Sequence, residues 1–236
     1  MVVRSCHHFA FIVLRERFLV NKKRGVLFFV KIPTLLPMPK RIRPHVNPLA
    51  ITKEFSFAGF GNDHPVIIDV GACKGEFVEV LIEKFPEKNF IVFEIRVPLA
   101  EKLRTKFADV KNVVVFDGDA GRNFRAIVEP CQKQGALVEE IFVNFPDPWF
   151  KEKHKKRRFV NSKFLEDCSQ WLDGRTDFIF QTDQEFLFNE TLEVVEESPY
   201  SSIERFSTSP YDTQTDWEQA KIKEGSSVWR MRFKKV

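Results

Sequence analysis

The sequence predicts a doubly wound α/β fold, in which helices cover both faces of a mostly parallel β-sheet. Short apolar runs alternate with segments of helical periodicity five times between residues 66 and 197. The runs are rich in Val, Ile and Phe, which is typical of strands buried on both faces. In such a fold ligands bind at the carboxyl ends of the strands, so we expect the functional residues there.

The first half of the predicted domain begins after a turn at residues 59–65 that is rich in Gly, Asn, Asp and Pro. The predicted strands here are apolar runs at residues 66–70, 90–95 and 113–116. The predicted helices that follow them cover residues 75–85, 98–107 and 127–134. Pro86 ends the first helix, and Pro98 lies in the first turn of the second, where proline is tolerated.

The second half continues the same alternation. Its predicted strands are residues 141–143, 178–181 and 229–233, and its predicted helices are residues 162–172 and 184–197. Ser162 is the expected N-cap of the first of these helices, because its hydroxyl can accept from a free backbone amide. In the last strand apolar residues alternate with Arg230 and Arg232, which predicts one buried and one exposed face.

Charge is unevenly distributed along the chain. Residues 1–43 carry ten Lys or Arg and one acid, whereas the rest carries 27 basic and 32 acidic residues. We therefore expect a basic N-terminal extension over residues 1–40, which is either an organelle transit segment or disordered, and one folded domain over residues 41–236. A start codon assigned too far upstream is the alternative explanation for the extension.

Hydropathy and cysteine spacing exclude other classes. The apolar runs at residues 9–14 and 26–30 are far shorter than the ~20 residues that cross a bilayer. The four cysteines have no regular spacing, so we predict neither a disulfide framework nor a metal site. We expect a soluble, intracellular protein without a membrane partner. It would lie in a plastid or another organelle if residues 1–40 are a transit segment, and in the cytoplasm otherwise.

The first strand runs into a glycine turn with the sequence DVGACKG, residues 69–75. Such a turn lets a ligand approach the backbone and the N-terminus of the next helix. The spacing of Gly71 and Gly75 does not match the pyrophosphate pattern G-x-G-x-x-G. Asp69 would oppose a pyrophosphate, whereas a ligand with a sulfonium and an amine, such as S-adenosylmethionine, tolerates it better. A tight turn without a ligand is the alternative.

Acids also follow the next two strands. Glu94 comes about 20 residues after Gly75, where a carboxylate can accept from both ribose hydroxyls. A solvated acid at the end of a strand is the alternative for Glu94. Asp119 follows the third strand, where an adenine edge would lie, and Asp117 competes with it two residues earlier. Either aspartate can also be an ordinary loop residue.

The fourth strand ends in the sequence NFPDPW, residues 144–149. Two prolines flank Asp147 and restrict both neighbours, which lowers the entropy cost of holding its carboxylate in one position. A fixed carboxylate can accept from the N–H donors of a nucleobase such as guanine. Trp149 either stacks on a base or fills the core.

A basic run follows, in which six of the eight residues 151–158 are Lys or Arg. A solvated helix face is the ordinary explanation for such a run. Here six like charges would repel one another without a counter-anion, so we favour phosphate binding. Asp183 after the fifth strand, and residues 215–218 in a predicted loop before the last strand, are further candidates, although loops are polar in any case.

Residues 145–158, FPDPWFKEKHKKRR, resemble the signature of the bacterial-type tRNA (guanine-N7)-methyltransferase family, TrmB. Further similarity lies in the glycine turn, in Thr182-Asp183 and in the sequences FEIR at residues 93–96 and TDWE at residues 215–218. Residues 41–50 are similar to cyanobacterial and plant members. The resemblance covers residues 41–236. It implies a seven-stranded, Rossmann-like S-adenosylmethionine-dependent methyltransferase fold and a tRNA partner.

Carried over residue by residue, the resemblance implies functional positions of two kinds. The residues implied to bind the cofactor S-adenosylmethionine are Asp69, Gly71, Gly75, Glu94, Asp119 and Asp147. The residues implied to contact tRNA or guanosine are Lys151, Asp183, Thr215, Asp216, Trp217 and Glu218. Asp147 is the implied catalytic residue, and the implied reaction methylates N7 of a guanosine in the tRNA variable loop.

The sequence departs from the family pattern in three places. Asp69 stands where many members have Glu, Cys73 replaces a small residue, and Asp216-Trp217 replaces the usual pair in its segment. Two other functions remain open: a non-catalytic RNA-binding module, and an amino-group methyltransferase, although the N-P-P-aromatic motif of the latter is absent after Asn144. The sequence does not distinguish a monomer from a homodimer.

Overall fold

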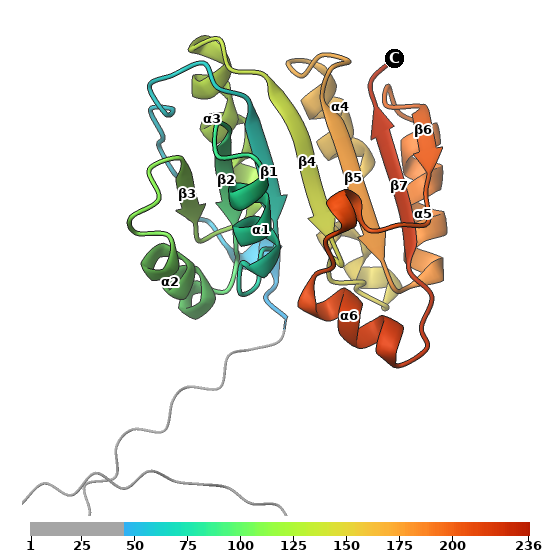
Figure 1. The fold of residues 1–236 in the computed structure, drawn as a ribbon. Helices are drawn as coiled ribbons and strands as arrows, with labels where there is room; N and C mark the ends of the chain where they lie inside the picture. Colours follow the sequence, from blue (N-terminus) through green and yellow to red (C-terminus); the bar gives the residue numbers. More distant parts are fainter. Residues whose placement is uncertain (1–44) are drawn as a thin grey trace, which may run out of the picture. The chain divides into compact units, whose positions relative to one another are not determined.

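The computed structural model describes residues 45–236 (Figure 1). The predicted basic extension, residues 1–40, and its boundary with the folded domain lie outside the described residues, so both stay predictions. Within the described part, no helix combines the length and the apolar composition that crossing a membrane requires.

A seven-stranded sheet forms the centre of the described domain, as the resemblance implied. Its strands are β1 (Val66–Val70), β2 (Asn89–Phe93), β3 (Val113–Phe116), β4 (Val138–Asn144), β5 (Asp177–Thr182), β6 (Ser202–Arg205) and β7 (Trp229–Lys234). They lie in the order β3-β2-β1-β4-β5-β7-β6. The first five strands are parallel to one another, whereas β7 is antiparallel to both of its neighbours. The predicted mostly parallel sheet is confirmed.

Helices cover both faces of this sheet (Figure 1). They are α1 (Glu76–Lys84), α2 (Val97–Lys106), α3 (Ala120–Lys133), α4 (Ser162–Ser169), α5 (Glu185–Glu196) and α6 (Asp216–Lys223). Successive strand residues point to opposite faces, so Ile67 packs in the core cluster of α1 and α2, and Ile68 in that of α3, α4 and α5. Both isoleucines are buried, which makes the sheet the shared wall of two apolar layers.

Aromatic side chains dominate the larger layer. Phe124 of α3 contacts the ring of Phe93 on β2, at 6.1 Å between centroids, and that of Phe164 on α4, at 5.2 Å. Phe178 of β5 stacks on Phe233, its partner in the register of antiparallel β7, with 5.1 Å between the ring centroids. Such pairs contribute roughly 0.5–1.5 kcal/mol each beyond the burial of their area.

Three local predictions are wrong. Asn161 caps α4, because its side chain accepts a hydrogen bond from the amide of Phe164, so the cap is not Ser162. Arg230 on β7 is buried, although the alternating pattern placed it on an exposed face. Residues 215–218 do not form a loop, because α6 begins at Asp216.

The sequence analysis also missed β6 and α6. The edge strand β6 has no buried residue, and α6 buries only the polar Glu218. Neither element therefore shows the apolar periodicity by which strands and helices are recognised in a sequence. Contacts with distant residues hold both elements in place.

Candidate active site at the carboxyl ends of the strands

The predicted acids lie in a row along one edge of the sheet. Asp69 is the next-to-last residue of β1, and the other four acids follow the next strands of the sheet: Glu94 follows β2, Asp119 follows β3, Asp147 follows β4 and Asp183 follows β5. Because these strands are parallel, all five residues come out at the same edge, and the strand order places them in the sequence 119, 94, 69, 147, 183 along it. The order of the strands reverses between β1 and β4, and ligands bind at such a switch point.

The glycine turn follows β1 in a conformation that side chains rarely adopt. Gly71 has φ +87° and Gly75 has φ +78°. A Cβ on Gly75 would lie 2.5 Å from Cδ2 of Leu103, so this position packs the turn against α2. A Cβ on Gly71 would meet no atom within 4 Å, so open space lies beside this residue. The space is where a ligand can approach the backbone of the turn.

Glu94 is 1% exposed and accepts four hydrogen bonds. The backbone amide of Cys73 donates to Oε2 at 2.9 Å, and that of Arg96 donates to Oε1 at 2.8 Å. The guanidinium of Arg96 also donates to both oxygens, at 2.8 Å each. Two backbone amides thus fix the carboxylate, and the Arg96 side chain neutralises it. Arg96 lies in the sequence FEIR that carries part of the resemblance, but it was not predicted as a site residue.

Asp69 is 4% exposed and lies near Glu94. Burial and the neighbouring negative charge raise the pKa of Asp69 from 3.8 to about 7, and the side chain of Asn144 partly opposes this shift. The amide nitrogen Nδ2 of Asn144 is itself buried and has no hydrogen-bond partner among the described residues. A buried acid without a cation fits a positively charged ligand, and a buried donor without an acceptor fits a ligand that can accept a hydrogen bond.

The two competing aspartates after β3 have different surroundings. Asp117 is buried and pairs with Lys53, at 2.8 and 2.9 Å, and with Arg104, and these cations hold its pKa below the usual value. Asp119 caps α3 by accepting from the amide of Gly121 at 3.1 Å, and burial raises its pKa. Asp117 already forms ion pairs with two cations, so Asp119 is the better candidate for contact with a ligand.

The loop after β4 holds Asp147 in a strained segment. Phe145 has φ +49° and Trp149 has φ +46°, and such conformations cost non-glycine residues about 1–3 kcal/mol each. Asp147 is 37% exposed, and its Oδ1 lies 2.7 Å from Nδ1 of His45. The rigid presentation of the Asp147 carboxylate stays a prediction. His45 was not predicted as a site residue, because it lies 102 residues from Asp147 in the chain.

Trp149 is half-buried, and side chains of the basic run lie against its ring. Its ring lies 4.8 Å from the guanidinium carbon of Arg157 and meets the ring of His154 edge to face at 5.8 Å. The next residue, Phe150, is 70% exposed and lies 5.4 Å from the ring of Phe186. Phe150 is thus better placed than Trp149 to meet a nucleobase.

The basic run forms a short 3-10 helix, η2 (Glu152–Arg157). The expectation that its charges lack a counter-anion is only partly right, because Glu190 of α5 pairs with Arg158 and with Lys155, the latter at 3.3 Å. Arg158 is buried in this contact. The remaining basic residues of the run have no ion pair among residues 45–236; they are Lys151, Lys153, Lys156 and Arg157.

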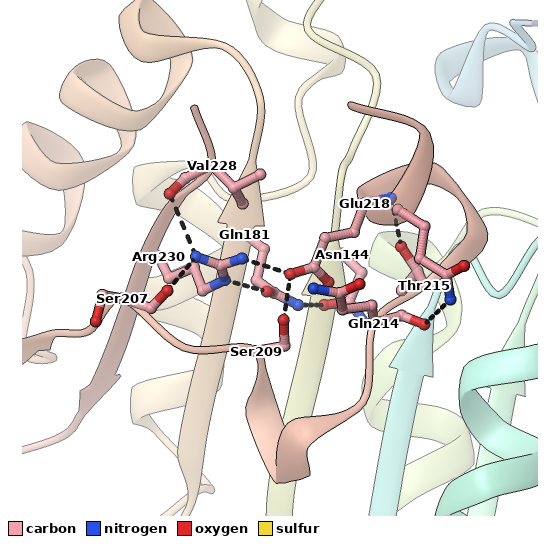
Figure 2. A network of polar contacts seen from close by, with 10 residues as sticks. Asn144, Gln181, Ser207, Ser209, Gln214, Thr215, Glu218, Val228 and Arg230 are labelled. Carbon is pink, nitrogen blue, oxygen red and sulfur yellow. Dashed lines mark hydrogen bonds and ion pairs between the residues drawn. The ribbon is translucent and has the colours of Figure 1, made fainter. Parts of the chain in front are cut away.

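The candidate substrate segment, residues 215–218, lies at the start of α6 (Figure 2). Thr215 caps the helix by accepting from the amide of Glu218 at 3.1 Å. Asp216 pairs with Lys74 of the glycine turn at 2.6 Å, so this segment and the glycine turn lie side by side. Trp217 is 53% exposed, whereas Glu218 is fully buried and pairs with Arg230.

Asp183 lies at the same edge, immediately after β5, and accepts from Nε2 of Gln184 at 2.9 Å. The structure therefore brings every predicted site residue to one end of the sheet. Among the residues predicted to contact tRNA or guanosine, only Glu218 is buried. Within the part of the chain that the structure describes, no group of three or more His, Cys, Asp or Glu is placed to hold a metal ion.

The comparisons with known proteins agree with this architecture. The solved structure of the 16S rRNA methyltransferase KamB superposes with a TM-score of 0.52 at 11% identity, over 73% of this chain and 88% of that chain. A family model described as "Putative methyltransferase" matches residues 63–231. The fold and the row of acids beside an open glycine turn define a Rossmann-like methyltransferase.

Relatives specify the family within this class. The tRNA (guanine-N(7)-)-methyltransferase of Listeria monocytogenes serotype 4b is 33% identical over 74% of this chain and 82% of that protein. That of Prochlorococcus marinus is 28% identical over 81% and 96%. Alignments with the proteins of Thermotoga maritima and Lactobacillus acidophilus span only 56% and 57% of those proteins. The chain belongs to the bacterial-type tRNA (guanine-N7)-methyltransferase family, which confirms the predicted resemblance.

Proposed function

We propose that this protein transfers a methyl group from S-adenosylmethionine to N7 of a guanosine in the variable loop of tRNA. The observation that carries the proposal is the continuous acidic edge. Buried Asp69 and Glu94 border the open turn at Gly71, and the half-buried carboxylate of Asp147 lies in the loop that follows the neighbouring strand β4. A cationic cofactor fits one end of this edge and a nucleobase fits the other.

The residues around the turn fit S-adenosylmethionine, which when bound supplies a methyl group activated by its sulfonium. Ionised Asp69 would neutralise the positive charge of the cofactor, and burial strengthens that interaction. Glu94 would accept from the ribose hydroxyls in place of the Arg96 guanidinium, while the amides of Cys73 and Arg96 keep its carboxylate oriented. Asp119 would accept from the adenine amino group.

Asp147 would stabilise the positive charge that develops on the guanine ring and would not remove a proton. Guanine N7 has an in-plane lone pair and no hydrogen, so attack on a methyl carbon needs no obligatory general base. The ring becomes cationic as the new bond forms, and a carboxylate fixed beside it stabilises that charge. Alignment of donor and acceptor supplies most of the remaining acceleration, worth up to about 7–11 kcal/mol in favourable systems.

The rim of the site would bind the rest of the tRNA. Lys151 and the other unpaired basic residues of the run would contact phosphates, and Phe150 and Trp217 offer exposed rings for stacking on bases. Asp183, Thr215 and Asp216 lie at the same edge and would contact the guanosine or its neighbours. This arrangement favours a polyanion with unstacked bases, such as the variable loop of tRNA.

The test is transfer of labelled methyl from S-adenosylmethionine to unmodified tRNA, followed by mapping of the product. Cleavage by borohydride and aniline at a variable-loop guanosine would support the proposal, because only the N7-methylated base is opened by that treatment. Label without cleavage would indicate an amino-group methyltransferase. RNA binding without cofactor binding or label would indicate a non-catalytic module.

A further inference from the structure

A chain of polar side chains crosses the carboxyl edge of the sheet from β4 to α6 (Figure 2). Asn144 at the end of β4 accepts from Nε2 of Gln181 on β5 at 2.7 Å. Gln181 in turn accepts from Nε of Arg230 on β7 at 2.8 Å. Arg230 donates through Nη2 to Glu218 of α6. Four residues from four elements therefore form one continuous network.

Arg230 is the centre of this network. It is 6% exposed and also donates through Nη1 to the backbone oxygen of Ser207, at 2.8 Å. Its planar guanidinium can bind three acceptors in fixed directions at once, which a lysine cannot. An ion pair buried as deeply as Arg230–Glu218 seldom contributes net stability, because both charges lose their hydration. Stability alone is therefore a weak explanation for the pair.

Glu218 cannot contact RNA in this conformation. It is fully buried, and its Oε1 accepts both from Arg230 and from the hydroxyl of Ser209. Its backbone amide donates to the side chain of Thr215, the cap of α6. Glu218 thus joins the first turn of α6 to the sheet, while Asp216 reaches the glycine turn through Lys74.

The first turn of α6 has few other attachments. The helix buries no apolar side chain among its residues, and Asp216 reaches the glycine turn through an exposed pair with Lys74. Exposed ion pairs contribute little to stability, because water screens both charges. The position of the substrate segment relative to the strand ends therefore depends on the contact between Glu218 and Arg230.

We infer that Arg230 is a positioning residue, which acts through Glu218 to hold Thr215 and Asp216 at the strand ends where the tRNA guanosine binds. The inference rests on the proposed function. In this arrangement Glu218 supports the substrate segment from inside the protein. Thr215, Asp216 and Trp217, which precede it, contact the tRNA directly. Gln181 and Asn144 extend the same support to the strand that leads into Asp147.

The test separates positioning from stability. We compare wild type with Arg230→Met, with Arg230→Lys and with the double variant Glu218→Met/Arg230→Met. The thermal midpoint, the Kd for S-adenosylmethionine without RNA, and kcat and KM with tRNA are measured for each. Arg232→Met, on the same strand, is the matched control, because Arg232 pairs with Asp177 and Glu204 outside the site.

We expect Arg230→Met to unfold at a lower temperature, because Glu218 remains as a buried unpaired charge. The double variant removes both charges and should recover most of the lost thermal stability. Its KM for tRNA should nevertheless stay at least tenfold above wild type, while the cofactor Kd changes less than twofold. Arg230→Lys should raise KM by about threefold, since it keeps the pair but loses the fork geometry. The control should match wild type in KM.

Two results would overturn the inference. The first is a double variant that recovers both stability and KM for tRNA, which would make the network a folding element only. The second is an unchanged KM in Arg230→Met. Absence of methyl transfer to tRNA by the wild-type protein is a separate outcome, which would overturn the proposed function itself. In that case the same comparison is made on the Kd for tRNA, measured by anisotropy.

Discussion

Nδ1 of His45 lies 2.7 Å from Oδ1 of Asp147, so the segment that precedes the sheet contacts the candidate catalytic acid directly. The ring of His45 also lies 6.1 Å from that of Trp149. The histidine thereby engages one carboxylate oxygen, Oδ1. Pro146 and Pro148 restrict the backbone of the same loop, and Phe145 and Trp149 adopt strained positive φ angles there.

Replacing His45 should therefore reduce the rate and not the affinity for the cofactor. We expect His45→Ala to lower kcat about three- to tenfold, which corresponds to roughly 0.7–1.4 kcal/mol for an exposed hydrogen bond to a charged group. The Kd for S-adenosylmethionine should be unchanged. Single-turnover rates check this, with Asp147→Asn as the background control. A further loss on adding His45→Ala to Asp147→Asn would show that the histidine acts elsewhere.

Asp147 itself should be required for its charge. Both Asp147→Ala and Asp147→Asn should lose at least 100-fold in kcat, about 2.7 kcal/mol, while tRNA binding is retained. Asparagine preserves shape and can still accept a hydrogen bond through its oxygen. A near wild-type rate for Asp147→Asn in a methyl-transfer assay would therefore rule out electrostatic stabilisation of the cationic base.

Asp69 should make cofactor affinity depend on pH. Its pKa in the folded protein, about 7, lies above the unfolded value of 3.8, and a cationic ligand requires the ionised form. Lowering the pH below 7 should therefore weaken S-adenosylmethionine binding, approaching tenfold per pH unit. Asp69→Asn should bind weakly at every pH, with a Kd near the acid limit of wild type. Calorimetric titrations between pH 5.5 and 7.5 test this, and a pH-independent wild-type Kd would contradict it.

The same residue should limit stability at high pH. Because the folded-state pKa is raised, the folded state holds the proton more tightly, and the free energy of unfolding falls as pH rises from about 4 to about 7. Asp69→Asn should thus increase stability at pH 8 by about 1–3 kcal/mol and have little effect at pH 4. Urea titrations at both pH values measure the difference. Equal effects at the two pH values would mean that the charge is not the cause.

The basic run should divide into two functional groups. Lys153→Ala/Lys156→Ala should weaken tRNA binding and lower the slope of log K against log salt by about 1.4–1.8, because each phosphate contact contributes about 0.7–0.9. Arg158→Ala should instead destabilise the protein, because it leaves Glu190 without its buried partner. Filter binding across salt concentrations and thermal melts distinguish the groups. An unchanged slope in the lysine variant would exclude these lysines from phosphate binding.

Much of the fold was predictable because its determinants are local. Each of the strands β1 to β5 contains a continuous apolar run of three or four residues, and the helices between them have apolar residues at helical spacing. Parallel strands that alternate with helices bring their carboxyl ends to one edge, so the acids at 69, 94, 119, 147 and 183 had to meet there. The resemblance of residues 145–158 then indicated the family.

The environment of each acid could not be predicted in this way. Asp117 and Asp119 look equivalent in the sequence, yet only Asp117 is held between Lys53 and Arg104. The charges of the basic run look unopposed, yet α5 brings Glu190 to two of them. Such pairs join residues far apart in the chain, and no periodicity or spacing records them.

Local sequence therefore determined which strands and helices form along most of the domain, and which acids end the strands. Tertiary structure alone decided which of those side chains stay accessible. No sequence feature shows that Glu218 is buried and Thr215 is not. In the folded protein Arg230 of β7 lies beside Glu218 and pairs with its buried carboxylate. Burial and ion pairing depend on how distant segments pack, so they are properties of the folded chain and not of its local order.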